Sequence, residues 1–134
     1  SYAGFIDENE ISNGINHAMS ATFPRMVLTP IIKYPAYAFD RNLEGGYKGN
    51  IPMGGRVGIP RSVSISSLQL RTFVGKQIAT AAQKYGFIAV DRGADGFTVR
   101  VRKSNPVKHP SLHSWDWQLQ EDLDKIYKNL KLVK

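Results

Sequence analysis

Apolar residues recur along this chain at two different spacings, and each spacing predicts a different element. Over residues 15–23 every second position except His17 is apolar, which predicts a strand with one buried face. The residues just before it, 7–13, begin with acidic side chains and end at Gly14, a pattern typical of a short helix. Residues 27–34 are apolar and β-branched but contain Pro30, which favours an edge strand or two short strands.

Two longer segments have apolar positions at helical spacing. Residues 72–85 predict a helix with one apolar face, and Gly86 follows at the position of a left-handed cap. Residues 115–130 predict a second helix, with an acidic side chain in its first turn and lysines in its last. Trp115 and Trp117 begin this helix, and we expect them to anchor it to a sheet.

Between these helices, three further segments predict strands. Residues 51–60 read as a glycine turn that leads into a short strand. Residues 87–91 are apolar on both faces, as in a central strand, and residues 97–102 alternate. The turn residues Asp95 and Gly96 lie between the last two segments, so we expect these to form a hairpin.

Together these elements predict an α+β fold in which two helices pack on a mainly antiparallel sheet of four to six strands. The 134 residues suit a single globular domain over 1–134. There is no cysteine, which excludes disulfides, cysteine-based zinc sites and cysteine nucleophiles. No apolar run is long enough to span a bilayer, so no membrane insertion is expected. The first residues lack the pattern of a signal peptide, so an exported protein would have lost its signal or be an excised domain.

The net charge of +7 is unevenly distributed. Residues 1–40 hold two basic and four acidic residues, whereas residues 41–134 hold 16 basic and seven acidic residues. Such a field attracts polyanions, which include acidic polysaccharide, nucleic acid and anionic lipid. The same excess of charge also serves solubility, and it says nothing about which partner is bound.

Several short motifs follow one another in a fixed order over nearly the whole chain. They are Glu10-Ile11, His17-Ala18-Met19, Tyr34-Pro35-Ala36, Ile51-Pro52-Met53-Gly54 with Arg56, Ala82 with Tyr85-Gly86 and Val90-Asp91, and Trp117 with Asp122 and Lys125-Ile126. In this order they resemble an uncharacterised group of exported bacterial proteins. The resemblance implies an extracellular or cell-surface location and an association with polysaccharide-handling or cell-surface modules. It implies no catalytic residue. The chain departs from the group's pattern at Lys33 and in the glycine-rich segment 45–49.

Glu10, His17 and Asp91 are the candidate catalytic residues. His17 has the same parity as Ile15 in the predicted strand and should point inward, either as a hydrogen-bonded core histidine or as a site residue. Asp91 ends a central strand, where sites often gather, although an aspartate entering a turn is also ordinary. Glu10 and Asp91 could form an acid/base pair for glycosidic cleavage, which needs two carboxylates about 5–10 Å apart.

The candidate ligand-binding residues are mostly arginines. Arg92, Arg100 and Arg102 gather on the predicted hairpin, where guanidinium groups could hold carboxylates or sulfates bidentately. Arg56 and Tyr85 complete this set of candidates. Basic residues interleaved with aromatic ones suit sugar-acid recognition or nucleic-acid binding. The alternative is a solvated strand face with its aromatic residues in the core.

The leading hypothesis is therefore an exported, non-catalytic accessory module that binds acidic surface glycan or polysaccharide. One alternative is a polysaccharide-cleaving enzyme that uses the three candidate catalytic residues. The other is a basic nuclease of the bacterial toxin type that uses His109 and His113, which lie near Asp116. Whether the protein is an enzyme stays open. No metal site and no cofactor are predicted, because neither the histidine spacing nor the glycine spacing matches a known motif.

Overall fold

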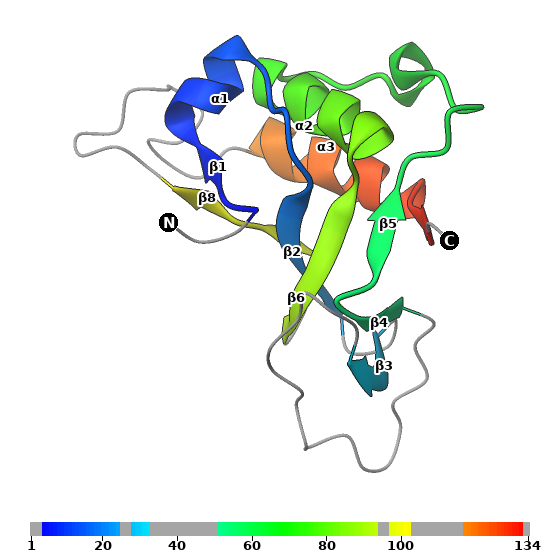
Figure 1. The fold of residues 1–134 in the computed structure, drawn as a ribbon. Coiled ribbons are helices and arrows are strands. Elements are labelled where there is room, and N and C mark those ends of the chain that lie inside the picture. Colours follow the sequence, from blue (N-terminus) through cyan, green and yellow to red (C-terminus); the bar gives the residue numbers. More distant parts are fainter. Residues whose placement is uncertain (1–3, 25–27, 33–50, 94–96, 103–116, 133–134) are drawn as a thin grey trace.

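The computed structural model describes residues 4–24, 28–32, 51–93, 97–102 and 117–132, with only the backbone in 24, 28–32, 51–53 and 90–93. A five-stranded sheet forms its centre, in the order β7-β2-β6-β5-β9 (Figure 1). β2 and β6 pair in parallel, and the other three pairs are antiparallel. With helices beside this sheet, the predicted α+β class is confirmed. The strands are Thr98–Val99 (β7), Met19–Pro24 (β2), Phe87–Gly93 (β6), Arg56–Gly58 (β5) and Lys131–Leu132 (β9).

The helices lie where the sequence predicts them. α1 (Glu8–Asn13) begins after Asp7 and ends at Gly14. α2 (Phe73–Lys84) begins after Thr72, whose side chain accepts a hydrogen bond from the N–H of Gly75. α3 is Trp117–Lys128, and a short 3-10 helix, η2, is Ile65–Leu68. Figure 1 shows α2 and α3 side by side next to the central sheet.

The core lies between this pair of helices and the central sheet, and aromatic rings connect the layers. The ring of Phe97 packs on Phe23 of β2 and edge-on against Phe87 of β6, with centroid distances of 5.3 and 5.1 Å. It also stacks on Tyr127 of α3 at 5.4 Å. Ile126 of α3 is fully buried in the same core. Phe97 thus ties the last helix to both central strands.

Two smaller sheets flank the central one. β1 (Ile6–Asp7) pairs in parallel with β8 (Val101–Arg102), and β3 (Leu28–Ile32) pairs in parallel with β4 (Ile51–Met53). The register of the second pair shifts between Thr29 and Ile32, next to the proline that marked this segment as an interrupted strand. In the part of the chain that the structure describes, each helix is too short or too polar to cross a bilayer.

The prediction of a strand with one buried face over 15–23 is wrong in two respects. The strand begins only at Met19, and both of its faces are buried, including Ser20 at 2% exposure and Thr22 at 6%. The chain near Gly4 runs beside this strand, and its carbonyl accepts a hydrogen bond from the N–H of Ser20. The polar positions of the alternation are small residues such as Ser20 and Thr22. Such residues can be buried when a neighbouring segment covers them, so the alternation did not indicate an exposed face.

The predicted hairpin is also wrong. β7 does not pair with β6, because β2 lies between them and pairs with both. The single strand expected over 97–102 is split into β7 and β8, with Arg100 between the two. β8 pairs with β1, outside the central sheet. Turn residues predict that a chain reverses direction, but they do not determine which strand becomes its neighbour.

The first turn of α3 also differs from the prediction. Trp117 does not anchor the helix to the sheet, because its side chain is 71% exposed. Trp115 lies outside the described residues. In the first turn, Leu119 packs against the core instead, and further along the helix Asp122 and Ile126 are fully buried.

Candidate functional site

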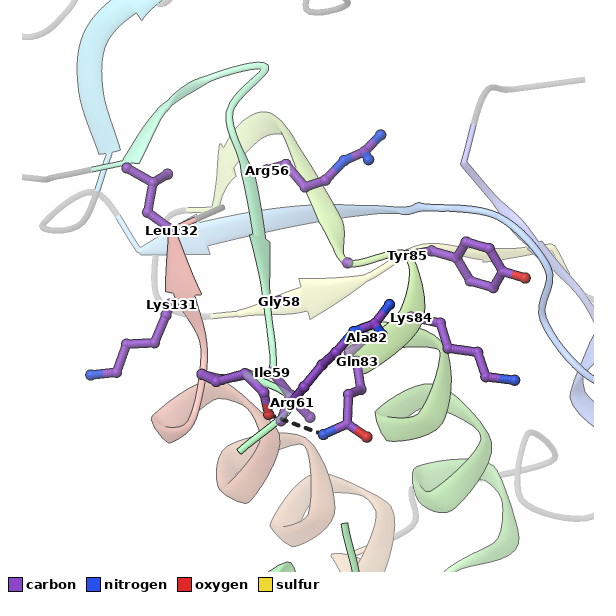
Figure 2. A pocket seen from close by; sticks show the side chains of 12 residues that line it. Arg56, Gly58, Ile59, Arg61, Ala82, Gln83, Lys84, Tyr85, Lys131 and Leu132 are labelled. Atoms are coloured by element: carbon purple, nitrogen blue, oxygen red, sulfur yellow. Dashed lines mark hydrogen bonds between the residues drawn. The ribbon is translucent and has the colours of Figure 1, made fainter. Parts of the chain in front are cut away.

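A cavity of about 460 Å³ lies where the end of α2 meets β5 and β9 (Figure 2). Its floor is small and buried, and consists of Gly58, Ile59, Ala82 and Gly86. The N–H of Ile59 donates to the carbonyl of Ala82 and so holds the chain after β5 against the helix end. These contacts give the cavity a floor without charged side chains.

Gly86 allows this close approach. Its φ is +81°, and a Cβ at this position would lie 2.5 Å from the carbonyl oxygen of Val57. Any other residue would meet both the strain of a left-handed conformation and a clash with the backbone of β5. The glycine that ends α2 therefore also sets the distance between the helix end and the sheet.

Four exposed cationic residues from four segments surround the cavity: Arg56, Arg61, Lys84 and Lys131. Arg56 lies in β5, Lys84 ends α2, and Lys131 belongs to β9. Lys131 reaches the cavity because β9 pairs with β5 in a register that sets it opposite Gly58. We call these four residues and their floor the basic pocket.

Gln83 positions the segment that carries Arg61. Its side-chain amide donates to the carbonyl of Pro60 at 3.0 Å and to that of Val63 at 2.7 Å. The first of these bonds is the dashed line in Figure 2. Because both acceptors flank Arg61, the loop after β5 is fastened to α2 on either side of that arginine.

The cations of the basic pocket have no neutralising partner among the described residues. Within the described residues, none of the four has an ion pair or a side-chain hydrogen bond. No acidic residue is among the described residues that line the cavity. Other cations are paired: Arg71 with Glu121 at 3.3 Å, and Lys128 with Asp124 at 2.8 Å. Like charges around one cavity create a positive potential that attracts anions.

Two of the predicted ligand-binding residues, Arg56 and Tyr85, meet at this pocket. Tyr85 is partly buried at the end of α2 and lines the cavity. It is the only aromatic residue among the described lining residues. The sequence thus indicated one cation and the aromatic ring of the site, from segments about thirty residues apart.

Of the remaining predicted arginines, Arg100 and Arg102 do not join this site. Arg100 is not a free cation on a solvated face, because its Nε is buried without a hydrogen-bond partner in the described part of the chain. Its guanidinium carbon lies 5.8 Å from the ring centroid of Phe5. Arg102 is exposed in β8. The side chains of Arg92 and of the candidate catalytic residue Asp91 lie outside the described part.

Glu10 and His17 come together, as partners of each other. Glu10 Oε2 lies 2.8 Å from His17 Nε2, and His17 Nδ1 donates to the carbonyl of Ala18 at 2.9 Å. The other carboxylate oxygen of Glu10 accepts from the N–H of Asp7. Both ring nitrogens therefore face acceptors, which favours the cationic imidazolium and leaves no lone pair to accept a proton.

The surroundings of His17 raise its pKa. Partial burial alone would lower the pKa, but the Ala18 carbonyl, the bond to Glu10 and the negative charges of Glu10 and Asp7 outweigh that effect. The side chain of His17 is 36% exposed, so the expectation that it points inward is wrong. The physical reason is that the residue precedes β2 and does not belong to it.

Among the described residues, the structure brings no further candidate site together. His109, His113 and Asp116 lie outside the described residues, so a nuclease site built on them stays a prediction. Among the residues that are described, no group of three or more histidine and carboxylate side chains is placed to hold a metal ion.

The sequence pointed to three residues of the basic pocket only weakly or not at all. Lys84 had a signal, since it precedes the glycine that ends a predicted helix and must lie at that helix end. Arg61 directly follows the predicted strand segment 51–60. The end of that strand could have been expected on the same side of the sheet as the end of the helix that carries Lys84. Lys131 had no signal, because β9 is two exposed residues long and has no periodicity.

The chain matches no known protein family, and no curated protein or solved structure is significantly similar to it. The function therefore has to be argued from the residues and geometry of the basic pocket.

Proposed function

We propose that this protein is a non-catalytic module that binds acidic polysaccharide or cell-surface glycan at the basic pocket, and that it acts outside the cell or on its surface. The observation that carries the proposal is the set of four cations, unpaired within the described residues, around one small, uncharged floor. Scattered surface cations serve solubility, but cations gathered around a cavity without an acidic neighbour favour a negatively charged ligand.

Tyr85 supports a glycan over a nucleic acid. Proteins that bind single-stranded nucleic acid commonly stack successive bases on several aromatic side chains. The described lining of the basic pocket includes one such ring, that of Tyr85, together with the aliphatic Ile59 and Ala82. One ring and a small apolar floor suit one sugar ring, while the arginines suit its carboxylate or sulfate. The location outside the cell is supported by the resemblance of the ordered motifs to exported bacterial proteins.

The experiment compares two double variants that lose the same charge. Arg61→Gln with Lys84→Gln removes two cations of the basic pocket. Lys76→Gln with Arg102→Gln removes two exposed cations that form no ion pair within the described part of the chain and lie outside the pocket lining. Calorimetric titration with polygalacturonate in 0.1 M salt should show binding about five- to thirtyfold weaker in the pocket variant, since two exposed charge contacts of about 0.5–1 kcal/mol each are lost.

The matched control variant should stay within about twofold of the unaltered protein, because long-range attraction alone is screened over about 10 Å at 0.1 M salt. Equal losses in both variants would mean that only net charge matters, and would overturn the proposal. Neutral dextran should not bind. Single-stranded DNA that binds more tightly than polygalacturonate, with the same dependence on Arg61 and Lys84, would overturn the glycan assignment in favour of nucleic acid.

A further inference from the structure

We infer that the basic pocket recognises a run of several acidic sugar residues laid across its mouth, and not a single anion held inside it. This inference rests on the proposed function and narrows its ligand to the interior of a linear, repeatedly charged chain. It follows from where the cations point, from what the floor can bind, and from how strongly exposed charges bind.

The side chains of Lys84 and Lys131 diverge from each other. In Figure 2 they point to opposite sides, Arg56 points away above them, and the side chain of Arg61 extends between them across the middle of the pocket. Arg56 and Gly58 are about 7 Å apart along β5, and Lys131 lies across from Gly58 about 5 Å away on the next strand. The charges of Lys84 and Lys131 are thus arranged to meet separate anionic groups, whereas one carboxylate would be held by a fully convergent set.

The floor has little with which to hold an anion. The N–H groups of Tyr85 and Gly86 both donate to the carbonyl of Ala81, and that of Ile59 donates to Ala82. The side chains of the floor carry no hydrogen-bond donor. A buried charge without partners is strongly disfavoured. Acidic groups must therefore bind at the rim, and the floor can accept the uncharged face of a sugar ring beside Tyr85.

Each rim contact is weak by itself. All four cations are exposed, and contacts between exposed charges are screened by water and salt. Usable affinity then requires several contacts that are linked through one ligand, because the second and later contacts form at a high effective concentration. A ligand long enough to reach from Lys84 to Lys131 gains this advantage, and a single acidic sugar does not.

The test is a length series of one acidic sugar: galacturonate as monomer, dimer, tetramer and octamer, titrated calorimetrically into the full chain at one low salt concentration. We expect no measurable binding of the monomer, and an octamer affinity at least about tenfold above that of the dimer. Monomer or dimer affinity within about threefold of the octamer would overturn the inference. If that short ligand still depended on Arg61 and Lys84, the proposed function would stand. If no length bound in a pocket-dependent way, the proposed function itself would fail.

Salt dependence gives a second readout on the octamer. Four contacts, at about 0.7 released counterions each as for a single-stranded polyanion, predict a slope of log affinity against log salt near −3. Lys131→Gln should reduce the magnitude of that slope by about 0.7, and Lys76→Gln, its matched control, should leave the slope unchanged. A slope near −1, or equal slopes in Lys131→Gln and Lys76→Gln, would contradict a ligand that spans the mouth.

Discussion

At the scale of single residues, the ion pair of Glu10 and His17 connects two parts of the fold. The pair connects α1 to the segment before β2, because Glu10 lies in the helix and His17 immediately precedes the strand. The carboxylate also accepts the N–H of Asp7 at the start of the helix. Two residues that the sequence suggested as catalytic thus hold a short helix against the strand that follows it.

The raised pKa of His17 predicts how stability changes with pH. A pKa above its unfolded value of 6.5 means that the stabilisation is fully present below that value, and is lost as the pH rises through the folded pKa. His17→Gln should therefore lower the free energy of unfolding more at pH 5.5 than at pH 8.5. The difference should stay under about 1 kcal/mol because the pair is partly exposed.

Urea denaturation of the unaltered protein and of His17→Gln at both pH values measures this difference. An effect that is independent of pH, or larger at pH 8.5, would show that the imidazolium does not stabilise the fold.

The role of a single residue could be predicted from the sequence where that role depends only on its neighbours in the chain. Gly14 and Gly86 follow predicted helices and indeed end them. Asp122 was missed, although its spacing held a signal: it lies three residues after Leu119 and four before Ile126, on the apolar stripe. A carboxylate on such a stripe must find donors when it is buried. Arg100 was misjudged because its burial depends on Phe5, a residue far away in the sequence.

At the scale of elements, the helices were predictable and the strand pairing was not. Caps and a 3.6-residue period are local properties, so α2 was found nearly to the residue. The neighbours of β2 are set by contacts between segments that are about seventy residues apart. Turn residues could not reveal that β2 lies between β6 and β7, and neither β1 nor β9 has enough residues for a period to show.

Asp122 is the residue that joins the two long helices. Its carboxylate accepts the N–H groups of Arg71 and Thr72 at 2.9 and 2.8 Å, and the hydroxyl of Thr72 at 2.6 Å. These groups precede α2, so a side chain of α3 satisfies donors at the start of the other helix. A negative charge at this end also complements the helix dipole.

Asp122→Ala should therefore lower the free energy of unfolding by about 3 kcal/mol or more, because buried donors would lose their acceptor. Asp124→Ala is the matched control: it removes an exposed carboxylate of the same helix, paired with Lys128, and should cost under about 0.5 kcal/mol. Chemical denaturation followed by circular dichroism compares the two. A cost for Asp122→Ala similar to that of the control would mean that the carboxylate does not hold the helices together.

At the scale of the whole molecule, the uneven charge predicted a polyanion partner but not its site. The excess of basic residues lies after residue 40. Among the described residues, some of these cations are paired with acidic groups and others are not. Arg71 before α2 and Lys128 of α3 are neutralised by ion pairs, and Lys125 donates to the carbonyl of Gln69. Four cations that have no partner within the described residues lie around the cavity between α2, β5 and β9. That gathering needs the strand order, which is why the sequence alone indicated only Arg56 and Tyr85.

The measurement that tests the central claim most directly is amide chemical-shift mapping by nuclear magnetic resonance. The isotope-labelled chain is titrated with a galacturonate octamer, and each backbone signal is followed. The account predicts that the largest shifts fall on Gly58, Tyr85, Gly86 and Lys131, while the amides of Ile6 and Arg102 in the β1–β8 sheet stay in place. Largest shifts on the β1–β8 sheet, or anywhere else away from the basic pocket, would contradict it.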